Sequence, residues 1–238
     1  MDERSWNESE QQEKYSNARN ILLNDVIDRI RAAENFGEVF PDIREDILDV
    51  FDADLVMVYE MAANGRELVC RLASNSDIGE NRLQVSPRSV VGYVAQTHET
   101  VWLDDVYDAG SLEQISKDLA FDNAVDYETG ELTQALLAIP LAYKGKTSGV
   151  LVISTNAGSH GKPSFDTDDR NRAKSLADEI AEKLSFGEKT TEGPFDLLIR
   201  KGWIDNERLE EIAGYAAEHR LSLTRLLIQE QNIPADEI

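Results

Sequence analysis

Two pairs of short apolar runs, each separated by a turn signal, restrict the folds that this chain can adopt. The first pair, residues 55–59 and 68–72, flanks Asn64-Gly65, and apolar runs about an Asn-Gly pair are the strongest short-range signal for a β-hairpin. The second pair, residues 136–141 and 150–153, flanks a Lys-Gly-Lys turn and predicts another hairpin. The middle of the chain is therefore expected to form a mostly antiparallel sheet.

Helical patterns lie on both sides of the hairpins. Apolar residues recur at spacings of three and four from Ser16 onward, and a second helix is expected from about Pro41, whose missing N–H is tolerated in a first helical turn. Asp166 or Thr167 is expected to cap a closing helix that ends near Phe186. The apolar stripes of the first and closing helices consist of Ile21, Leu23, Val26, Ile27 and Ile30 and of Ala173, Leu176, Ala177, Ile180 and Leu184. The sequence thus predicts an α+β fold in which these two helices lie together on one face of the sheet.

The segment between the hairpins has a different character. A short helix is expected near residues 90–97 and a strand at 100–103, and a loop-rich stretch follows from 104 to 133. Long irregular segments inside a compact domain usually carry function. This stretch is therefore expected to carry the function of the domain.

Composition excludes several classes of function. The 238 residues include 24 Lys and Arg against 46 Asp and Glu, for a net charge of −22, so the surface repels nucleic acids and anionic membranes. Cys70 is the single cysteine, which rules out an intrachain disulfide and a cysteine-based zinc cluster. The N-terminus lacks the apolar segment of a signal peptide, and apolar stretches such as residues 135–143 are too short to span a membrane. We expect a cytoplasmic protein that neither binds nucleic acid nor inserts into membranes.

No enzyme signature emerges from the sequence. Gly145-Lys146-Thr147 resembles the end of a phosphate-binding loop, but Pro140 stands where the first glycine of that motif belongs, and the segment joins two strands. The three histidines, His98, His160 and His219, are scattered and stand at no metal-ligand spacing. We therefore predict neither catalytic residues nor a metal site.

Four segments follow one another as they do in a known family. They are residues 92–97, 101–105, 121–133 with the strand that continues from them, and 149–153. In this order they resemble a GAF domain, most closely the type found in cyclic-nucleotide phosphodiesterases and adenylyl cyclases. We assign residues 16–186 to this domain. The resemblance implies a non-catalytic module that senses a small molecule or dimerises.

Members of this family that bind cyclic nucleotides carry an Asn-Lys…Phe-x-x-x-Asp-Glu signature. Asn156, Phe165 and Asp169 match it, whereas Ala157 and Arg170 replace the lysine and the glutamate. The family's lysine pairs with the aspartate carboxylate, so its loss weakens the case for a pocket that closes around a phosphate. A cyclic nucleotide is therefore left open as a ligand, and no other cofactor is implied.

If a ligand binds, the resemblance places its pocket over the sheet, beneath residues 104–133. Asp105, Asp126, Thr129 and Thr133 are expected to supply its polar lining, together with the three residues that match the signature. Asp105, Asp126, Thr129 and Thr133 are also typical of turns and helix caps, and that alternative stays open.

The last part of the chain carries a second resemblance. After a polar linker at residues 187–193, residues 197–205 and 221–229 repeat a pattern of three apolar residues followed by a few mostly polar ones. This repeat is similar to the N-terminal helical domain of type II secretion and type IV pilus assembly ATPases, and it predicts a small all-helical adaptor over residues 194–238. A new helix start just before residue 238 leads us to expect that an ATPase core follows.

The two resemblances together predict the regulatory N-terminal region of a secretion or pilus-assembly ATPase, with residues 1–15 as a flexible, frayed or helical lead-in. Its partners would be the ATPase core or an inner-membrane platform protein. It would form a homodimer through the helices at 16–33 and 169–186. Two alternatives remain open: a stand-alone cyclic-nucleotide sensor, and a purely structural dimerisation module with an empty pocket.

Overall fold

The computed structural model describes residues 3–75, 78, 81–158 and 164–187, together with 204, 208, 212 and 227. The chain divides into two compact units, Met1–Gly187 and Glu188–Ile238. In the second unit Ile204, Ile212 and Leu227 are buried, as expected of residues in the apolar core of a small domain. The predicted linker and most of the two repeated segments of the tail lie outside the described residues.

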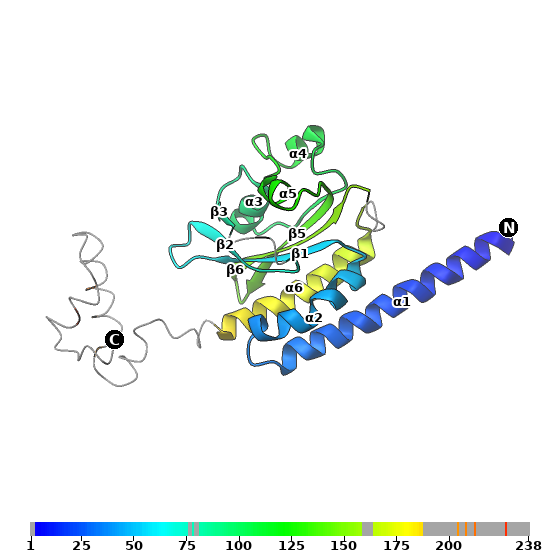
Figure 1. Ribbon diagram of the computed structural model, residues 1–238, viewed down its shortest axis with the longest axis horizontal. Coiled ribbons are helices and arrows are strands. Elements are labelled where there is room, and N and C mark those ends of the chain that lie inside the picture. The colour runs from blue at the N-terminus through cyan, green and yellow to red at the C-terminus, as the bar shows by residue number, and fades with distance from the viewer. Residues whose placement is uncertain are drawn as a thin grey trace. The chain divides into compact units, whose positions relative to one another are not determined.

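The first unit is built on a six-stranded antiparallel sheet (Figure 1). Its strands are β1 (Leu55–Met61), β2 (Glu67–Ala73), β3 (Arg82–Gln84), β4 (Val101–Leu103), β5 (Thr133–Tyr143) and β6 (Lys146–Asn156). Across the sheet they follow the order β3-β2-β1-β6-β5-β4, so β1 and β6 lie at the centre. Both predicted hairpins are confirmed, and Lys144 and Gly145, with φ of 49° and 81°, form the two-residue turn between β5 and β6.

Three helices lie on one side of this sheet: α2 (Phe36–Phe51) and α6 (Thr167–Gly187) cover its face, and α1 (Glu3–Ala32) packs against both of them (Figure 1). Strand side chains alternate between the two faces, so Val56 and Val58 of β1 pack against these helices. The helices complete this core with side chains that include Val26, Ile30, Ile43, Ile47, Leu176 and Ile180. The α+β architecture is therefore confirmed, with the first and closing helices on one face of the sheet.

One helix boundary differs from the predictions, and the lead-in takes the helical one of its expected forms. α1 begins at Glu3, so the lead-in continues the helix, which extends past α2 and α6 (Figure 1). α2 begins at Phe36 rather than near Pro41, which lies inside the helix. The reason is the cap, because the Asn35 side chain accepts a hydrogen bond from the Glu38 N–H (2.9 Å), and the early start also buries Phe36.

The opposite face of the sheet is covered by α3 (Val90–Thr97), α4 (Ala109–Ile115), α5 (Ala124–Thr129) and the loops between them (Figure 1). We refer to residues 104–132 on this face as the lid. A second apolar core lies between the lid, α3 and the strand residues that point away from α1, α2 and α6, among them Leu55, Met57 and Tyr59 of β1. The lid therefore covers the face for which the sequence predicts a pocket.

Candidate functional site

A small cavity lies between the sheet and the lid. Its volume is about 30 Å³, which is room for about one or two water molecules. The lid contributes Phe121, Asp122 and Val125 to its wall. The remaining lining residues are Leu55, Met57, Tyr59, Asn81, Leu83, Val90, Val91, Thr133, Leu136, Val152 and Ser154. Most of this lining is apolar, and Thr133 is the one predicted site residue that contributes to it.

Asp126 and Thr133, both predicted as pocket residues, hold the lid against the sheet. The buried Asp126 carboxylate, in the first turn of α5, accepts hydrogen bonds from the Thr133 Oγ1 (2.7 Å) and the Thr133 N–H (3.0 Å) at the start of β5. It also accepts a hydrogen bond of 2.6 Å from the Tyr107 hydroxyl. The carboxylate thus connects two parts of the lid to the sheet, and we call Tyr107, Asp126 and Thr133 the lid latch.

Tyr107 forms the outer part of the lid latch. Its ring packs edge-on against Phe121, with 5.5 Å between the ring centroids. Partial burial and the hydrogen bond to the Asp126 carboxylate raise the pKa of Tyr107 to about 12. The hydroxyl is therefore protonated at neutral pH, which is the form that donates to Asp126.

Asp105 and Thr129, also predicted as pocket residues, lie in turns of the lid and do not line the cavity. Asp105 is exposed, and its carboxylate accepts a hydrogen bond from the Tyr107 N–H (2.9 Å). Thr129 ends α5, where its hydroxyl donates to the Val125 carbonyl (3.0 Å). Both side chains support local backbone geometry, which is the alternative that the sequence leaves open.

The three residues that match the family signature lie outside the cavity wall. Asn156, at the end of β6, donates through its backbone N–H to Asp54 (2.7 Å) and through its side-chain amide to Glu131 of the lid (2.5 Å). Phe165 is buried in the core on the helix side of the sheet. Asp169 lies in the first turn of α6 and has no exposed surface. These residues connect the lid, the sheet and the helices.

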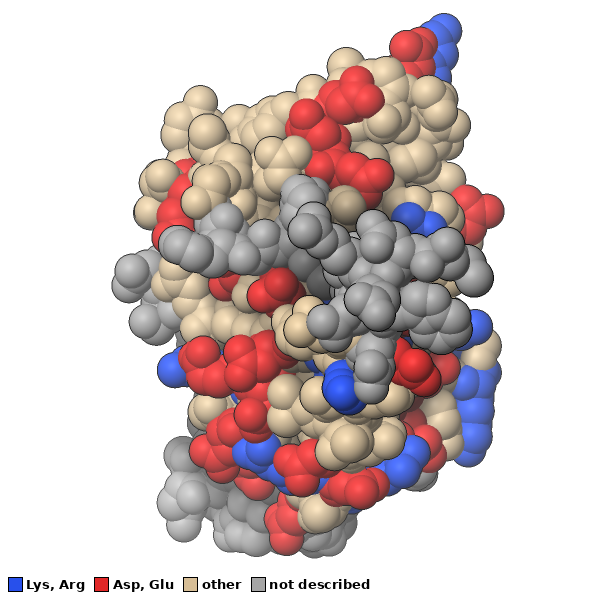
Figure 2. Space-filling model, turned by 90° about the vertical axis from the view of Figure 1, so that its right-hand side faces the viewer, with Lys and Arg blue, Asp and Glu red and all other residues tan. Residues whose placement is uncertain are grey.

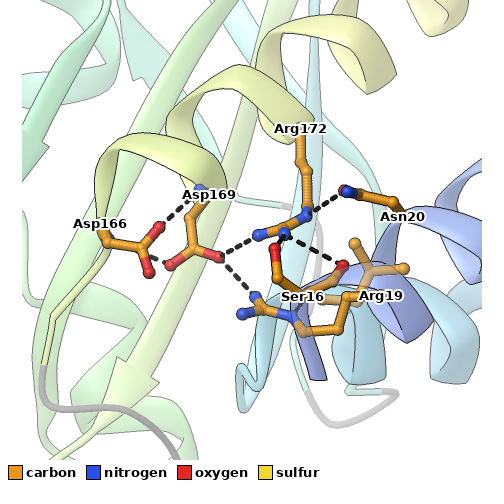
Figure 3. Close-up of polar contacts among 7 residues, drawn as sticks. Ser16, Arg19, Asn20, Asp166, Asp169 and Arg172 are labelled. Carbon is orange, nitrogen blue, oxygen red and sulfur yellow. Dashed lines mark hydrogen bonds and ion pairs between the residues drawn. The ribbon is translucent and has the colours of Figure 1, made fainter. Parts of the chain in front are cut away.

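Asp169 is the centre of a buried polar network (Figure 3). Its N–H donates to Asp166 Oδ1 (2.8 Å), and its Oδ2 accepts from the Asp166 N–H (3.0 Å), a reciprocal cap that satisfies backbone donors at the start of α6. Its Oδ1 accepts hydrogen bonds from the guanidinium groups of Arg19 (2.5 Å) and Arg172 (3.2 Å). One carboxylate therefore caps α6, with Asp166 as the predicted cap residue, and binds two buried arginines.

The two arginines attach α1 to its neighbours. Arg172, on α6, donates to the Ser16 hydroxyl (2.6 Å) and to the Asn20 side-chain oxygen (2.8 Å), both on α1 (Figure 3). Arg19, on α1, donates to the Val50 carbonyl near the end of α2. The network therefore joins α1, α2 and α6.

Sequence patterns reveal only part of this network. Arg172 stands three residues after Asp169 in a helix, a spacing at which opposite charges meet, so this pair is visible in the sequence. Arg19 lies 150 residues before Asp169, and no local pattern links the two. Asp169 thus pairs with two arginines in a chain that has Ala157 where the family signature has its lysine.

The chain matches the model of one protein family. The match to the GAF domain covers residues 35–184. The chain belongs to the GAF domain family. This confirms the prediction that the first unit is a GAF domain.

Solved structures share the fold of this GAF domain. The GAF domain of a phosphoenolpyruvate-protein phosphotransferase from Coxiella burnetii matches with a TM-score of 0.61 at 18% identity, over 74% of this chain and 97% of that one. Free methionine-R-sulfoxide reductase from Neisseria meningitidis, solved in complex with its substrate, matches at 0.58 and 15%, over 74% and 93%. Residues 122 to 287 of a methyl-accepting chemotaxis protein match at 0.55 and 18%, over 70% and 99%. At these identities the likeness shows the fold alone, and no curated protein matches the chain.

GAF domains are typically regulatory modules that bind small molecules or dimerise. The family match ends at residue 184 and so does not include the tail. No helix in the described part of the chain has the length and apolar character that a membrane crossing requires.

Proposed function

We propose that this GAF domain is a non-catalytic sensor, in which a small molecule occupies the cavity beneath the lid and shifts the helices on the other face of the sheet. The lid latch carries the proposal, because three hydrogen bonds to the Asp126 carboxylate hold the lid over the cavity. We infer that the lid also has an open state, in which these bonds are broken. A ligand that binds one state more tightly changes their populations by that difference in affinity.

Hydrogen bonds connect the lid to the helices. Glu131, in the lid, accepts a hydrogen bond from the Asn156 side chain, and the Asn156 N–H donates to Asp54, just beyond α2. α2 in turn accepts a hydrogen bond from Arg19 of α1 through the Val50 carbonyl. A lid movement that breaks the contact with Glu131 would therefore reach α2 and, through Arg19, the other two helices.

The charges around the cavity do not favour a cyclic nucleotide. Among the described residues that line it, none is Lys or Arg. The lid contains one base, Lys117, and nine acids: Asp104, Asp105, Asp108, Glu113, Asp118, Asp122, Asp126, Glu128 and Glu131. Acidic side chains also outnumber basic ones on the face shown in Figure 2, whose upper part is the lid side. A phosphodiester would be repelled here, so the cyclic nucleotide stays a prediction without a counter-charge to support it.

Hydrogen exchange of the whole chain tests the coupling between lid and helices. Tyr107→Phe removes one donor from the lid latch and keeps the ring, so we expect faster amide exchange in the lid and also in α1 and α6. Tyr127→Phe is the matched control, because Tyr127 lies on the same lid and is exposed. An increase confined to the lid would contradict the proposal, since a sensor needs coupling between its ligand site and its output.

We also propose that the domain forms a homodimer through α1. Most of the predicted apolar stripe of α1 is buried in this chain's own core, but Ile21 is 71% exposed, and Tyr15 on the same helix is also exposed. Contact with a second copy would remove this apolar surface from water. Sedimentation at high protein concentration tests the proposal, with Ile21→Glu expected to weaken the dimer. A wild-type chain that stays monomeric would contradict it.

As the wider setting, we propose the cytoplasmic regulatory region of a type II secretion or type IV pilus assembly ATPase, whose core or membrane-platform partner would contact the tail. The support is the repeated pattern at 197–205 and 221–229 and the burial of Ile204, Ile212 and Leu227. The coding sequence beyond the last residue tests this setting. An ATPase core with a phosphate-binding loop would support it, and a stop codon with no assembly ATPase encoded nearby would contradict it.

A further inference from the structure

We propose that the cavity beneath the lid binds a small uncharged molecule, with an apolar body and one polar group that hydrogen-bonds the Ser154 hydroxyl. This inference names a ligand class for the sensory site proposed above, and it rests on that proposal.

Ser154 lies in β6, and its side chain faces the cavity. The residue is 1% exposed, and its Oγ has no hydrogen-bond partner among the described residues. The next residue, Thr155, shows the usual arrangement on the opposite face, where its hydroxyl accepts a hydrogen bond from the Ala135 N–H (3.3 Å). A buried hydroxyl without a partner destabilises a fold. Its position at the wall of a cavity therefore points to a partner that is not part of the chain.

Two other polar side chains at the cavity wall are already engaged. Thr133 Oγ1 donates to Asp126 (2.7 Å), and the Asp122 carboxylate accepts a hydrogen bond from the Ala124 N–H (3.0 Å). Most of the remaining wall is hydrocarbon. A ligand would therefore pack against an apolar surface and use Ser154 as its buried polar anchor.

Neither a negatively charged nor a positively charged ligand suits this cavity. An anion would have to pass a lid of nine acids and one base, and among the described lining residues it would meet no Lys or Arg. A cation would have to leave water for a cavity whose wall is mostly apolar, and the carboxylate among the described lining residues, Asp122, already accepts a hydrogen bond from the Ala124 N–H (3.0 Å). An uncharged molecule meets neither obstacle.

The size of the closed cavity, about 30 Å³, means that a ligand of several heavy atoms requires the lid to move. Phe121 and Val125 are the apolar side chains that the lid contributes to the wall, so outward movement of the lid would enlarge the cavity and leave Ser154 in place on β6. A water molecule bonded to Ser154 is the alternative occupant. Two experiments distinguish a small-molecule ligand from a fixed water.

The first experiment compares the thermal unfolding midpoints of full-length variants without any ligand. Ser154→Ala removes a hydroxyl that has no partner in the described part of the chain, so we expect the midpoint to stay the same or to rise. Thr155→Val, the matched control in the same strand, removes a hydroxyl that is bonded to Ala135 and is expected to lower the midpoint. A fall for Ser154→Ala as large as that for Thr155→Val would mean that its hydroxyl is already bonded, to the chain or to a fixed water, and would overturn the proposal.

The second experiment measures binding of four probes with the same carbon skeleton: isobutyramide and isobutanol, which are uncharged, and isobutyrate and isobutylammonium, which are ions. We expect the uncharged probes to shift the methyl NMR signals of Leu136 and Val152 saturably and to bind about tenfold or more tightly than the ions. Ser154→Ala should weaken binding of the uncharged probes by about two- to tenfold, the effect of one hydrogen bond. Tighter binding of either ion, equal binding by Ser154→Ala, or no saturable shift with any probe would each overturn the proposal.

These outcomes differ from those that test the sensory role. If an ion moved the same methyl signals and also accelerated exchange in α6, the sensor would stand and the uncharged ligand class would fall. If the uncharged probes bound through Ser154 without any change in α1 or α6, the binding site would stand and the sensory role would fall.

Discussion

Asp169 and Arg19, which are 150 positions apart in the sequence, form a buried ion pair with 2.5 Å between Oδ1 and Nη2. Their side chains are 0% and 5% exposed. Loss of one partner from a buried pair leaves the other charge without compensation in a medium of low polarity. This pair, with Arg172 on the same carboxylate, therefore makes the attachment of α1 to the domain depend on a residue of α6.

Asp169→Asn tests this dependence. Asparagine keeps the shape of the side chain but leaves Arg19 and Arg172 without a buried counter-charge, so we expect the free energy of unfolding to fall by about 3–5 kcal/mol. Urea denaturation followed by circular dichroism measures the change. Asp168→Asn is the control, because Asp168 is exposed in the same helical turn, and it should alter stability by less than about 0.5 kcal/mol. Similar values for the two variants would contradict the role of the pair.

The lid latch should make stability depend on pH in the alkaline range. Burial and the hydrogen bond to Asp126 raise the pKa of Tyr107 from 10 to about 12 in the folded protein. A group whose folded pKa is raised stabilises the fold fully below its unfolded pKa, so this contribution is present below pH 10 and is lost as the pH rises toward 12. The hydrogen bond to Glu99 also raises the pKa of Tyr93, so spectrophotometric titration should show more than one tyrosine that ionises late, and Tyr107→Phe should reduce this late fraction. A late fraction of unchanged size in Tyr107→Phe would argue against the latch.

Tyr107 and Thr133 should be energetically coupled through Asp126. Their hydroxyls donate to the same carboxylate, at 2.6 and 2.7 Å. We expect Tyr107→Phe and Thr133→Val each to lower the free energy of unfolding by roughly 1–2 kcal/mol, and the double variant to differ from their sum by about 0.5 kcal/mol or more. A second cycle, with Thr129→Val in place of Thr133→Val, is the control and should be additive, because the Thr129 hydroxyl bonds elsewhere. Additivity in both cycles would show that the latch does not act as a unit.

Nucleotides should leave the thermal midpoint unchanged. A ligand at about 100 times its Kd adds about 2.7 kcal/mol, which raises the midpoint of a chain of this size by roughly 5–10 °C. The acidic lid and the absence of Lys and Arg from the described cavity wall predict no such shift with cyclic AMP, cyclic GMP, cyclic di-GMP or ATP. A clear shift with either cyclic mononucleotide would instead make the stand-alone nucleotide sensor the leading function.

The candidate site was only partly visible in the sequence. Asp126 and Thr133 are recognisable as polar residues of the stretch that covers the sheet, but nothing local indicates that they bond to each other and to Tyr107. Asp105 and Thr129 are also an aspartate and a threonine of this stretch, yet their side chains form hydrogen bonds within local turns of the lid. Composition cannot separate these two pairs, because the difference lies in which side chains the folded lid turns toward the sheet.

Sequence patterns predict much of the secondary structure of this protein, since turn chemistry and periodicity act over a few neighbouring residues. They yield both hairpins, Asp166 as one of two candidate caps of α6, and the apolar faces of α1 and α6, but they do not yield β3, α4 or α5. Local patterns do not predict the start of α2 at Phe36, because the Asn35 cap and the packing of the helix outweigh the preference of Pro41 for a first turn. The partners of Asp169, the lid latch and the burial of the Ser154 hydroxyl away from any partner among the described residues depend on packing between distant segments. Hydrogen bonds and ion pairs form only between groups that the fold brings within about 3 Å of each other. The order of residues along the chain does not reveal which distant groups come that close.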